Sequence, residues 1–184
     1  MKILYLLVFI PFLVQGQKID QPTHFTDLLD RSGLEFLAPL DAGYKDVTVI
    51  KNFLQDYNFA IRSRKEKLEI RYLIEPWQEN DPSFQAPHVR CVSKLMNLAT
   101  NNQEVVMTGL DIDTSQLAEE FNADWGKVFF FQPKPHFSKN QHIKMLALFK
   151  EGKGMAYVFF LFDEPSRDLD NRIIALRFKE ELTN

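Results

Sequence analysis

The chain has few residues from which a covalent or metal-bound framework could be built. It contains one cysteine, Cys91, and four histidines that form neither an H-x-x-x-H nor an H-E-x-x-H pair. A single thiol excludes an internal disulfide, so core packing must stabilise the fold. The histidine spacing excludes the common zinc motifs. The chain also lacks an N-x-Ser/Thr sequon, which favours a bacterial periplasm or outer surface over a eukaryotic secretory pathway.

Catalytic and phosphate-binding motifs are missing as well. No G-x-S-x-G elbow is present, which argues against a serine hydrolase of that type. Gly152-x-Gly154 is the only closely spaced glycine pair, and it lies in a predicted hairpin turn with no helix after it. A phosphate cradle at a helix N-terminus is therefore not expected.

Neither sign of charge dominates the chain. The 22 basic and 25 acidic residues are interleaved and give a formal net charge of −3. This balance indicates an ordinary solvated surface, and it favours neither nucleic acid nor an anionic membrane as a partner.

The longest apolar run lies at the N-terminus. Lys2 precedes the run Ile3–Val14, which is broken only by Pro11. Val14 and Gly16 are small residues at the two positions that define the cleavage site, so cleavage is expected after Gly16. This layout predicts a secretory signal peptide over residues 1–16 and an exported protein, periplasmic or extracellular. The run is shorter than the ~20 residues that span a bilayer as a helix. An uncleaved membrane anchor is the alternative.

The chain after the leader is predicted to form a single α/β domain. Residues 17–33 are a lead-in, either flexible or helical from about Thr26, and residues 34–184 are the domain. Strands are predicted over residues 34–40, 46–52, 59–62, 68–76, 127–132, 142–150 and 155–162. The last three are apolar on both faces, which predicts helices on both sides of the sheet. The expected fold class is therefore a mainly antiparallel sheet in an α/β/α sandwich.

The hairpin over residues 59–75 shows the clearest alternation. In its return strand Leu68, Ile70, Tyr72 and Ile74 share one face, and Glu69, Arg71 and Glu75 share the other. A period of two predicts one buried face and one solvent-exposed face. The exposed face is the first candidate surface for a protein partner.

Helices are predicted in the middle of the chain and at its end. Over residues 88–102, Val89, Val92, Met96 and Ala99 fall on one face and are expected to point inward, with Leu95 and Leu98 beside them. A second helix is expected from Asp113 or Thr114, with Leu117, Ala118 and Phe121 inward. At the end of the chain, a helix from Arg167 is favoured over a strand through Ile174, Leu176 and Phe178, because a sheet buried on both faces needs a cover.

The stretch FNADWGKVFFFQPK, residues 121–134, lies at the centre of the aromatic residues. It is predicted to join the helical middle to the closing strands through a turn at Asp124-Trp125-Gly126, in which Gly126 allows the sharp change of direction. The three consecutive phenylalanines are interpreted as a central strand. The alternative is that they line an apolar ligand cleft with Trp125.

The order of the predicted elements resembles that of the PsbP-like fold of small exported proteins. The resemblance covers most of the mature chain. It rests on the opening LEFLAPLDAGYKDV at residues 34–47, a charged hairpin, a helical middle, and three closing strands before a C-terminal helix. It implies an antiparallel sheet between helical layers and a binding or accessory role, since proteins of this fold are generally not enzymes. No catalytic or ligand-binding residue carries over from it.

Cys91 and His88 are the first candidates for catalysis. They lie three residues apart at the start of a predicted helix, where the pKa of a thiol can be lowered. A cysteine beside an apolar stripe is more often a small buried hydrophobe, and that interpretation is favoured.

Candidates for metal binding are scattered through the chain. Besides His88 they are His24, His136 and His142, of which the last two flank a basic loop and could meet in space. Asp111-x-Asp113-x-Ser115 begins like a calcium loop, but glutamine and asparagine replace the glycine and glutamate that such a loop requires. Asp113 is better explained as a helix cap.

The sequence assigns no catalytic, cofactor-binding or metal-binding residue. The leading hypothesis is an exported, non-catalytic binding or accessory protein of the cell envelope with an unknown protein partner. An envelope hydrolase would need a pocket that holds at least two of Glu120, Asp124, His136 and His142, although acidic residues near a short surface helix, with Glu119 among them, usually face solvent. A carrier of a small apolar ligand would need a cavity of about 300 Å³ or more, lined by Phe129, Phe131 and Phe160.

Overall fold

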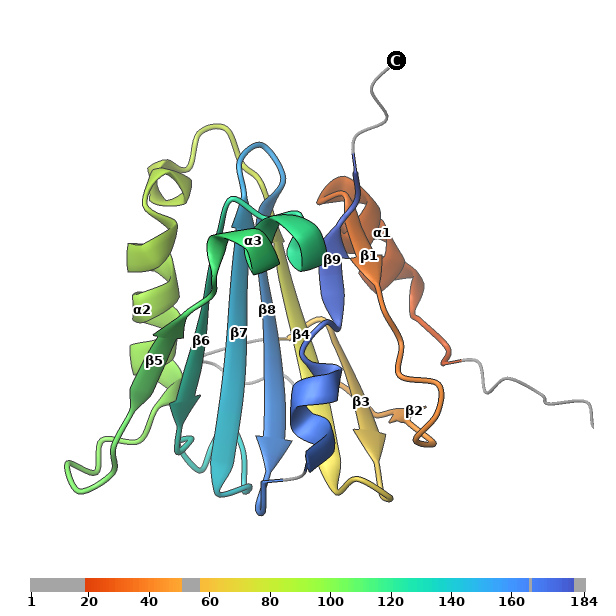
Figure 1. Cartoon of the computed structure of the whole chain (residues 1–184), viewed down its shortest axis with the longest axis vertical. Helices are drawn as coiled ribbons and strands as arrows, with labels where there is room; N and C mark the ends of the chain where they lie inside the picture. Colours follow the sequence, from red (N-terminus) through yellow and green to blue (C-terminus); the bar gives the residue numbers. More distant parts are fainter. Residues whose placement is uncertain (1–18, 51–56, 166, 181–184) are drawn as a thin grey trace, which may run out of the picture.

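A seven-stranded antiparallel sheet in the order β2-β3-β4-β8-β7-β6-β5 forms the centre of the fold (Figure 1). The computed structural model describes residues 19–50, 57–165 and 167–180. The strands are β2 Lys45–Asp46, β3 Phe59–Ser63, β4 Leu68–Pro76, β5 Thr108–Asp111, β6 Trp125–Phe131, β7 His142–Lys150 and β8 Gly154–Phe162. A second sheet pairs β1 Leu34–Phe36 with β9 Leu176–Phe178. The predicted α+β fold with a mainly antiparallel sheet is confirmed.

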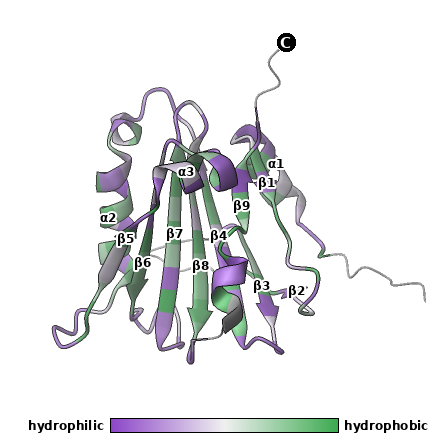
Figure 2. Ribbon diagram, viewed as in Figure 1, coloured by the Kyte–Doolittle hydropathy of each residue, from purple (hydrophilic) through white to green (hydrophobic). Residues whose placement is uncertain are grey.

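Strand β8 is the most deeply buried element. It lies between β4 and β7, and all nine of its residues are buried. Figure 2 shows β7 and β8 as largely apolar along their length. The apolar run over residues 155–162 has this composition because neither of its faces meets water.

Two layers cover the two faces of the sheet. The first face packs against α1 Thr23–Arg31, the β1–β9 sheet, α3 Thr114–Gln116 with its one-turn π-helical continuation η2 Leu117–Phe121, and the 3-10 helix η3 Arg167–Arg172. The second face packs against α2 Pro87–Leu98 and the 3-10 helix η1 Pro82–Gln85. Figure 1 shows α3 and the blue helix η3 on the same side of the sheet. The predicted cover on both faces is therefore present.

The lead-in, predicted to be either flexible or helical, contains helix α1. This helix begins at Thr23 rather than near Thr26, and Phe25 and Leu29 are buried in the first-face core. The ring of Phe25 stacks on that of Phe59 at 4.6 Å between centroids. The predicted signal peptide, residues 1–16, lies outside the described residues.

The prediction of an exposed face on the 59–75 hairpin is wrong. Every residue of β4 from Leu68 to Ile74 is buried, including Glu69 and Arg71. The loop around Phe137 covers this face, and the two charges neutralise each other in an ion pair of 2.7 Å. Alternation in the sequence marked the two faces correctly, but it did not show that distant residues cover the polar one.

The predicted inward face of α2 is right for Leu95, Leu98 and Ala99, which are buried, and wrong for the other three residues. Cys91, Leu95 and Leu98 are the buried residues of this helix. Val89, Val92 and Met96 instead point outward, with exposed fractions of 58, 48 and 59%. Helix α2 is apolar on two sides. In the observed rotation it buries the side with Cys91, and the nitrogens of Arg90 and Lys94 lie 2.8 and 2.6 Å from the Glu75 carboxylate on β4.

The second predicted helix is confirmed in position but not in every inward residue. The Asp113 carboxylate accepts a hydrogen bond from the backbone N–H of Ser115 at 2.9 Å and so caps α3, as predicted. Leu117 and Phe121 pack into the core, whereas Ala118 is exposed.

Several element boundaries differ from the predictions. The strand expected over 34–40 ends at Phe36, and the one expected over 46–52 is reduced to β2, with residues 51 and 52 outside the described ranges. Strand β5 was not predicted, because its sequence TGLD has little strand propensity and gains its pairing from β6. The chain does not end in a helix over its last apolar residues. Instead the short η3 is followed by β9, which pairs with β1.

Gly126 does not form the predicted turn. The left-handed residue is Asn122, with φ of 49°, and Gly126 lies inside β6. A Cβ at position 126 would stand 2.7 Å from Leu117 Cδ2 and 3.1 Å from Leu148 Cδ2. The space over Gly126 is thus filled by leucine methyl groups, because η2 packs directly on the strand.

Candidate functional site

Cys91 cannot act as a nucleophile in this fold. Its side chain is fully buried, and burial raises the pKa of the thiol to about 12. His88, three residues before it, is exposed. The thiol therefore stays protonated at neutral pH, and its favoured interpretation as a buried hydrophobe is confirmed.

The acidic and histidine candidates for a hydrolase lie at opposite ends of β6. Glu120 and Asp124 precede this strand, whereas His136 follows it and His142 begins the antiparallel β7. Seven strand residues rise roughly 20 Å. The Asp124 carboxylate accepts a hydrogen bond from the backbone N–H of Glu151 at 2.8 Å, and that of Glu120 accepts one from Gln116 at 2.9 Å. No acid–histidine pair of the predicted set can form across this distance.

The histidines have separate surroundings. The ring of His142 packs against Phe162 at 5.7 Å between centroids, and His24 Nε2 lies 2.9 Å from the carbonyl oxygen of Asn58. Within residues 19–50, 57–165 and 167–180, no group of three or more histidine, cysteine, aspartate or glutamate side chains could hold a metal ion.

The three phenylalanines expected to line a ligand cavity lie on opposite faces of the sheet. Phe129 and Phe131 belong to the second-face core, whereas Phe160 belongs to the first-face core. They cannot line one cavity together. Of the three consecutive phenylalanines of β6, Phe130 is the one that faces the first side, because side chains alternate along a strand.

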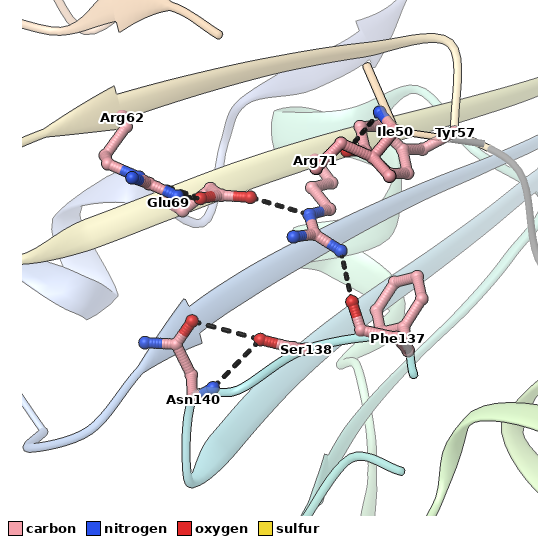
Figure 3. A network of polar contacts seen from close by, with 8 residues as sticks. All are labelled: Ile50, Tyr57, Arg62, Glu69, Arg71, Phe137, Ser138 and Asn140. Carbon is pink, nitrogen blue, oxygen red and sulfur yellow. Dashed lines mark hydrogen bonds and ion pairs between the residues drawn. The ribbon is translucent and has the colours of Figure 1, made fainter. Parts of the chain in front are cut away.

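A network of polar contacts surrounds Arg71 on the second face (Figure 3). Its Nε donates to Glu69 Oε1 at 2.7 Å and its Nη1 to the carbonyl oxygen of Phe137 at 2.6 Å. The guanidinium lies between the rings of Tyr57 and Phe137, at 4.7 and 5.0 Å from their centroids. Arg62 Nε donates to the second oxygen of Glu69 at 2.8 Å. This network fastens the loop around Phe137 to β4, and we interpret it as structural.

A different hollow on the first face combines apolar walls with a buried charge. It lies between η3 and the β5–β6 edge and has a volume of about 390 Å³. We call it the lysine cleft. Its lining residues are Leu110, Asp111, Ile112, Gln116, Phe121, Val128, Phe130, Lys144, Asp170 and Ile173.

Lys144 supplies the buried charge of the lysine cleft. Its side chain is 7% exposed, and its ammonium nitrogen lies 2.7 Å from Asp170 Oδ1 and 5.5 Å from the centre of the Phe130 ring. The Asp170 side chain is 87% exposed. An ammonium carries three donors, and within the described part of the chain Asp170 is the one acceptor bonded to it.

Helix η3 holds Asp170 at the rim of the cleft. Arg172 anchors this helix, with its Nη1 2.9 Å from Asp41 Oδ1 and its Nη2 2.5 Å from Glu66 Oε1. The Tyr44 hydroxyl donates to the same glutamate at 2.5 Å. Burial, together with the hydrogen bond to Glu66, raises the pKa of Tyr44 well above its usual range. Asp170 therefore extends from a fixed support.

Two larger hollows lack this combination. One, of about 590 Å³, runs along β2 and β3 and is lined mainly by charged side chains such as Lys45 and Arg64. The other, of about 430 Å³, lies between residues 36–40 and 171–175, and its one charged lining residue, Arg172, is already bonded to two carboxylates. Among the described residues that line them, neither hollow presents a buried charge with unused hydrogen-bonding capacity.

No family model, curated protein or solved structure matches the chain. The PsbP-like resemblance therefore stays a prediction. Among the helices that the structure describes, none has the length and apolar composition needed to cross a membrane.

The sequence contained a signal for Lys144 that its apolar context obscured. Lys144 is in phase with Leu146 and Leu148 on β7, which are fully buried on the first face. A lysine at such a position must either reach water or be buried with a partner. The partner, Asp170, lies in a segment whose position the sequence did not predict.

An exposed apolar stripe is a second candidate surface. It consists of Val89, Val92 and Met96 on the outer side of α2, and we call it the α2 stripe. A small hollow of about 130 Å³ joins Met96 to Met107. A helix that faced only solvent on this side would carry polar residues there.

Proposed function

We propose that this protein is an exported, non-catalytic binding protein that carries a small apolar ligand in the lysine cleft. The observation that carries the proposal is the cleft itself, whose volume of about 390 Å³ lies in the range of small-molecule sites. Export rests on the predicted signal peptide. The proposal that the protein is non-catalytic rests on the buried Cys91 and on the separation of the acidic and histidine candidates along β6.

The walls of the cleft favour an apolar ligand. Val128, Phe130 and Phe121 form its floor and one end, and Ile112 and Ile173 stand at its sides. Leu110 at the rim is 52% exposed. Covering such surface releases water and stabilises the complex by roughly 25 cal/mol per Å² of apolar area buried.

The test is the binding of medium-chain probes to the full chain. Octanol and octanoate are titrated by calorimetry, and the site is located from backbone amide shifts in NMR spectra. We expect the shifts to cluster on β5, β6 and η3. Leu110→Trp places an indole at the rim and should weaken binding roughly tenfold, whereas Val106→Trp, at a position 81% exposed and outside the cleft, should not. Equal binding by both variants, or no binding by the wild type, would contradict the proposal.

A protein partner at the α2 stripe is the second candidate function. Three outward apolar side chains on one helix form a surface of the kind that helix-binding grooves recognise. Val92→Glu should abolish recovery of a partner from the native envelope, while Ser93→Glu, which adds the same charge at the next and also exposed position, should not. Recovery of the same proteins by both variants would contradict a role for the stripe.

A further inference from the structure

We infer that the ligand of the lysine cleft is an acid: a small apolar molecule with one carboxylate, which replaces Asp170 on the Lys144 ammonium. The inference rests on the proposed carrier function and adds the chemical class of its ligand. The exchange keeps the charge at Lys144 balanced, because one carboxylate leaves as another arrives.

The first step of the argument is the incomplete bonding of Lys144. Moving an ammonium out of water costs several kcal/mol, which is recovered only when the charge is paired and its donors are bonded. Here a side chain that is 7% exposed has one bonded acceptor within the described ranges. The Phe130 ring adds a cation–π contact at 5.5 Å. The ammonium therefore has donors that can contact a carboxylate entering from the cleft before Asp170 leaves.

The second step is the ease with which the Asp170 carboxylate can leave Lys144. The Asp170 side chain is 87% exposed, so its carboxylate keeps most of its hydration while it bonds to Lys144. Turning this side chain outward costs Asp170 itself little, and the arriving carboxylate supplies the counter-charge that the buried ammonium needs. Helix η3 need not move, because Arg172 holds it to Asp41 and Glu66.

The third step is the absence of a competing charge on the cleft walls that the structure describes. Asp111, the other carboxylate of the lining, is paired with Lys127 at 2.8 Å. Gln116 donates to Glu120 at 2.9 Å. Lys144 is therefore the cation that an anionic ligand would meet inside the cleft.

The fourth step is the polarity of the cleft floor. In the β6–β7 register Phe130 pairs with Lys144, Val128 with Leu146 and Gly126 with Leu148. The floor thus begins at the ammonium and continues through apolar residues toward η2, where Phe121 closes it. An amphiphile would lie with its acid group at Lys144 and its tail toward η2.

The experiment compares octanoate with octanol, which differ in the headgroup. Calorimetry on the full chain at neutral pH should show octanoate binding at least roughly tenfold more tightly than octanol. Lys144→Met should remove this preference and leave octanol binding in place. Asp170→Asn should tighten octanoate binding several-fold, because the competing carboxylate is gone, and so widen the preference for octanoate over octanol. Lys139→Met, at an exposed lysine outside the cleft lining, should keep the wild-type preference.

The outcomes separate the inference from the function on which it rests. Equal affinity of the wild type for the two probes would overturn the acid headgroup while leaving a carrier of apolar ligands. Binding of neither probe would overturn both. Weaker octanoate binding by Asp170→Asn would show that Asp170 helps to form the site, and it would overturn the exchange even if Lys144→Met proved insoluble.

Discussion

Gly154 lies against the backbone carbonyl of Glu75, so closely that a Cβ at position 154 would overlap that oxygen. Gly154 begins β8 with φ of 117° and pairs with Pro76 at the end of β4. The β7–β8 turn therefore brings two strands into backbone contact where a side chain has no space.

Alanine at the two glycines of this turn should have unequal effects. Gly152 also has a positive φ, of 70°, but nothing lies within 4 Å of a Cβ there. Gly152→Ala should therefore cost only the ~1–2 kcal/mol of a left-handed residue. Gly154→Ala must displace backbone and should cost more than about 3 kcal/mol or prevent soluble expression. Urea unfolding measures both, and equal costs would show that the close approach does not exist.

Alanine at Gly126 should destabilise the fold by overpacking. Its Cβ would press on Leu117 of η2, and overpacking of this kind costs ~1–3 kcal/mol. Gly126→Val, which adds two further methyl groups, should cost more than Gly126→Ala. Leu117→Ala in the Gly126→Ala background should recover part of the loss, so the two changes should be less than additive in a double-mutant cycle. Full additivity would contradict the contact.

Removal of the Glu69 carboxylate should cost far more than removal of the Arg62 guanidinium. The side chain of Glu69 is 6% exposed and bonds to two arginines, whereas that of Arg62 is 58% exposed. Glu69→Gln leaves Arg71 buried without its counter-charge, for which about 3–5 kcal/mol is expected. Arg62→Gln should change the free energy of unfolding by about 1 kcal/mol or less. A reversed order in chemical unfolding would show that the network is misassigned.

The ion pair of Asp41 should make stability depend on pH in acid. The hydrogen bond from Arg172 holds the pKa of this carboxyl below its usual value. A lowered pKa in the folded state means that the contribution is fully present above the unfolded pKa of about 4 and is lost as the pH falls through the lower folded pKa. Asp41→Asn should therefore reduce the unfolding midpoint at pH 7, and its difference from the wild type should shrink steadily as the pH is lowered below about 4. A constant difference across this range would contradict the ionic origin.

Cys91 should resist alkylation in the folded protein. Burial raises the pKa of its thiol to about 12, so almost no thiolate exists at pH 8 and reagents cannot reach the sulfur. Iodoacetamide should label the protein only in denaturant, as mass spectrometry would show. Rapid labelling of the native protein would mean that α2 opens from the sheet.

Features that depend on near neighbours in the chain could be predicted from the sequence. The β3–β4 and β7–β8 hairpins follow from alternation and turn residues, and the apolar β8 follows from its buried place in the sheet. The Asp113 cap is equally local. In each case the residues that decide the structure lie within a few positions of one another.

Features that depend on distant partners could not be predicted. The observed rotation of α2 brings Arg90 to Glu75 on β4, and the loop at Phe137 covers Arg71. The lysine cleft depends on Asp170, which the chain brings to Lys144 from 26 positions away. A local pattern with two apolar sides, or with a charge among leucines, is compatible with several arrangements until those partners are in place.

The pairing of β1 with β9 sets an order of events during synthesis. About 140 residues separate Leu34 from its partner Phe178, and β4 likewise waits about 90 residues for β8. When the nascent chain has emerged only as far as α2, first-face aromatic residues such as Phe25 and Phe59 still lack the β8 and β9 residues that pack with them in the core. Because contacts so distant in sequence close slowly, native structure should form late, after β8 and β9 have left the ribosome.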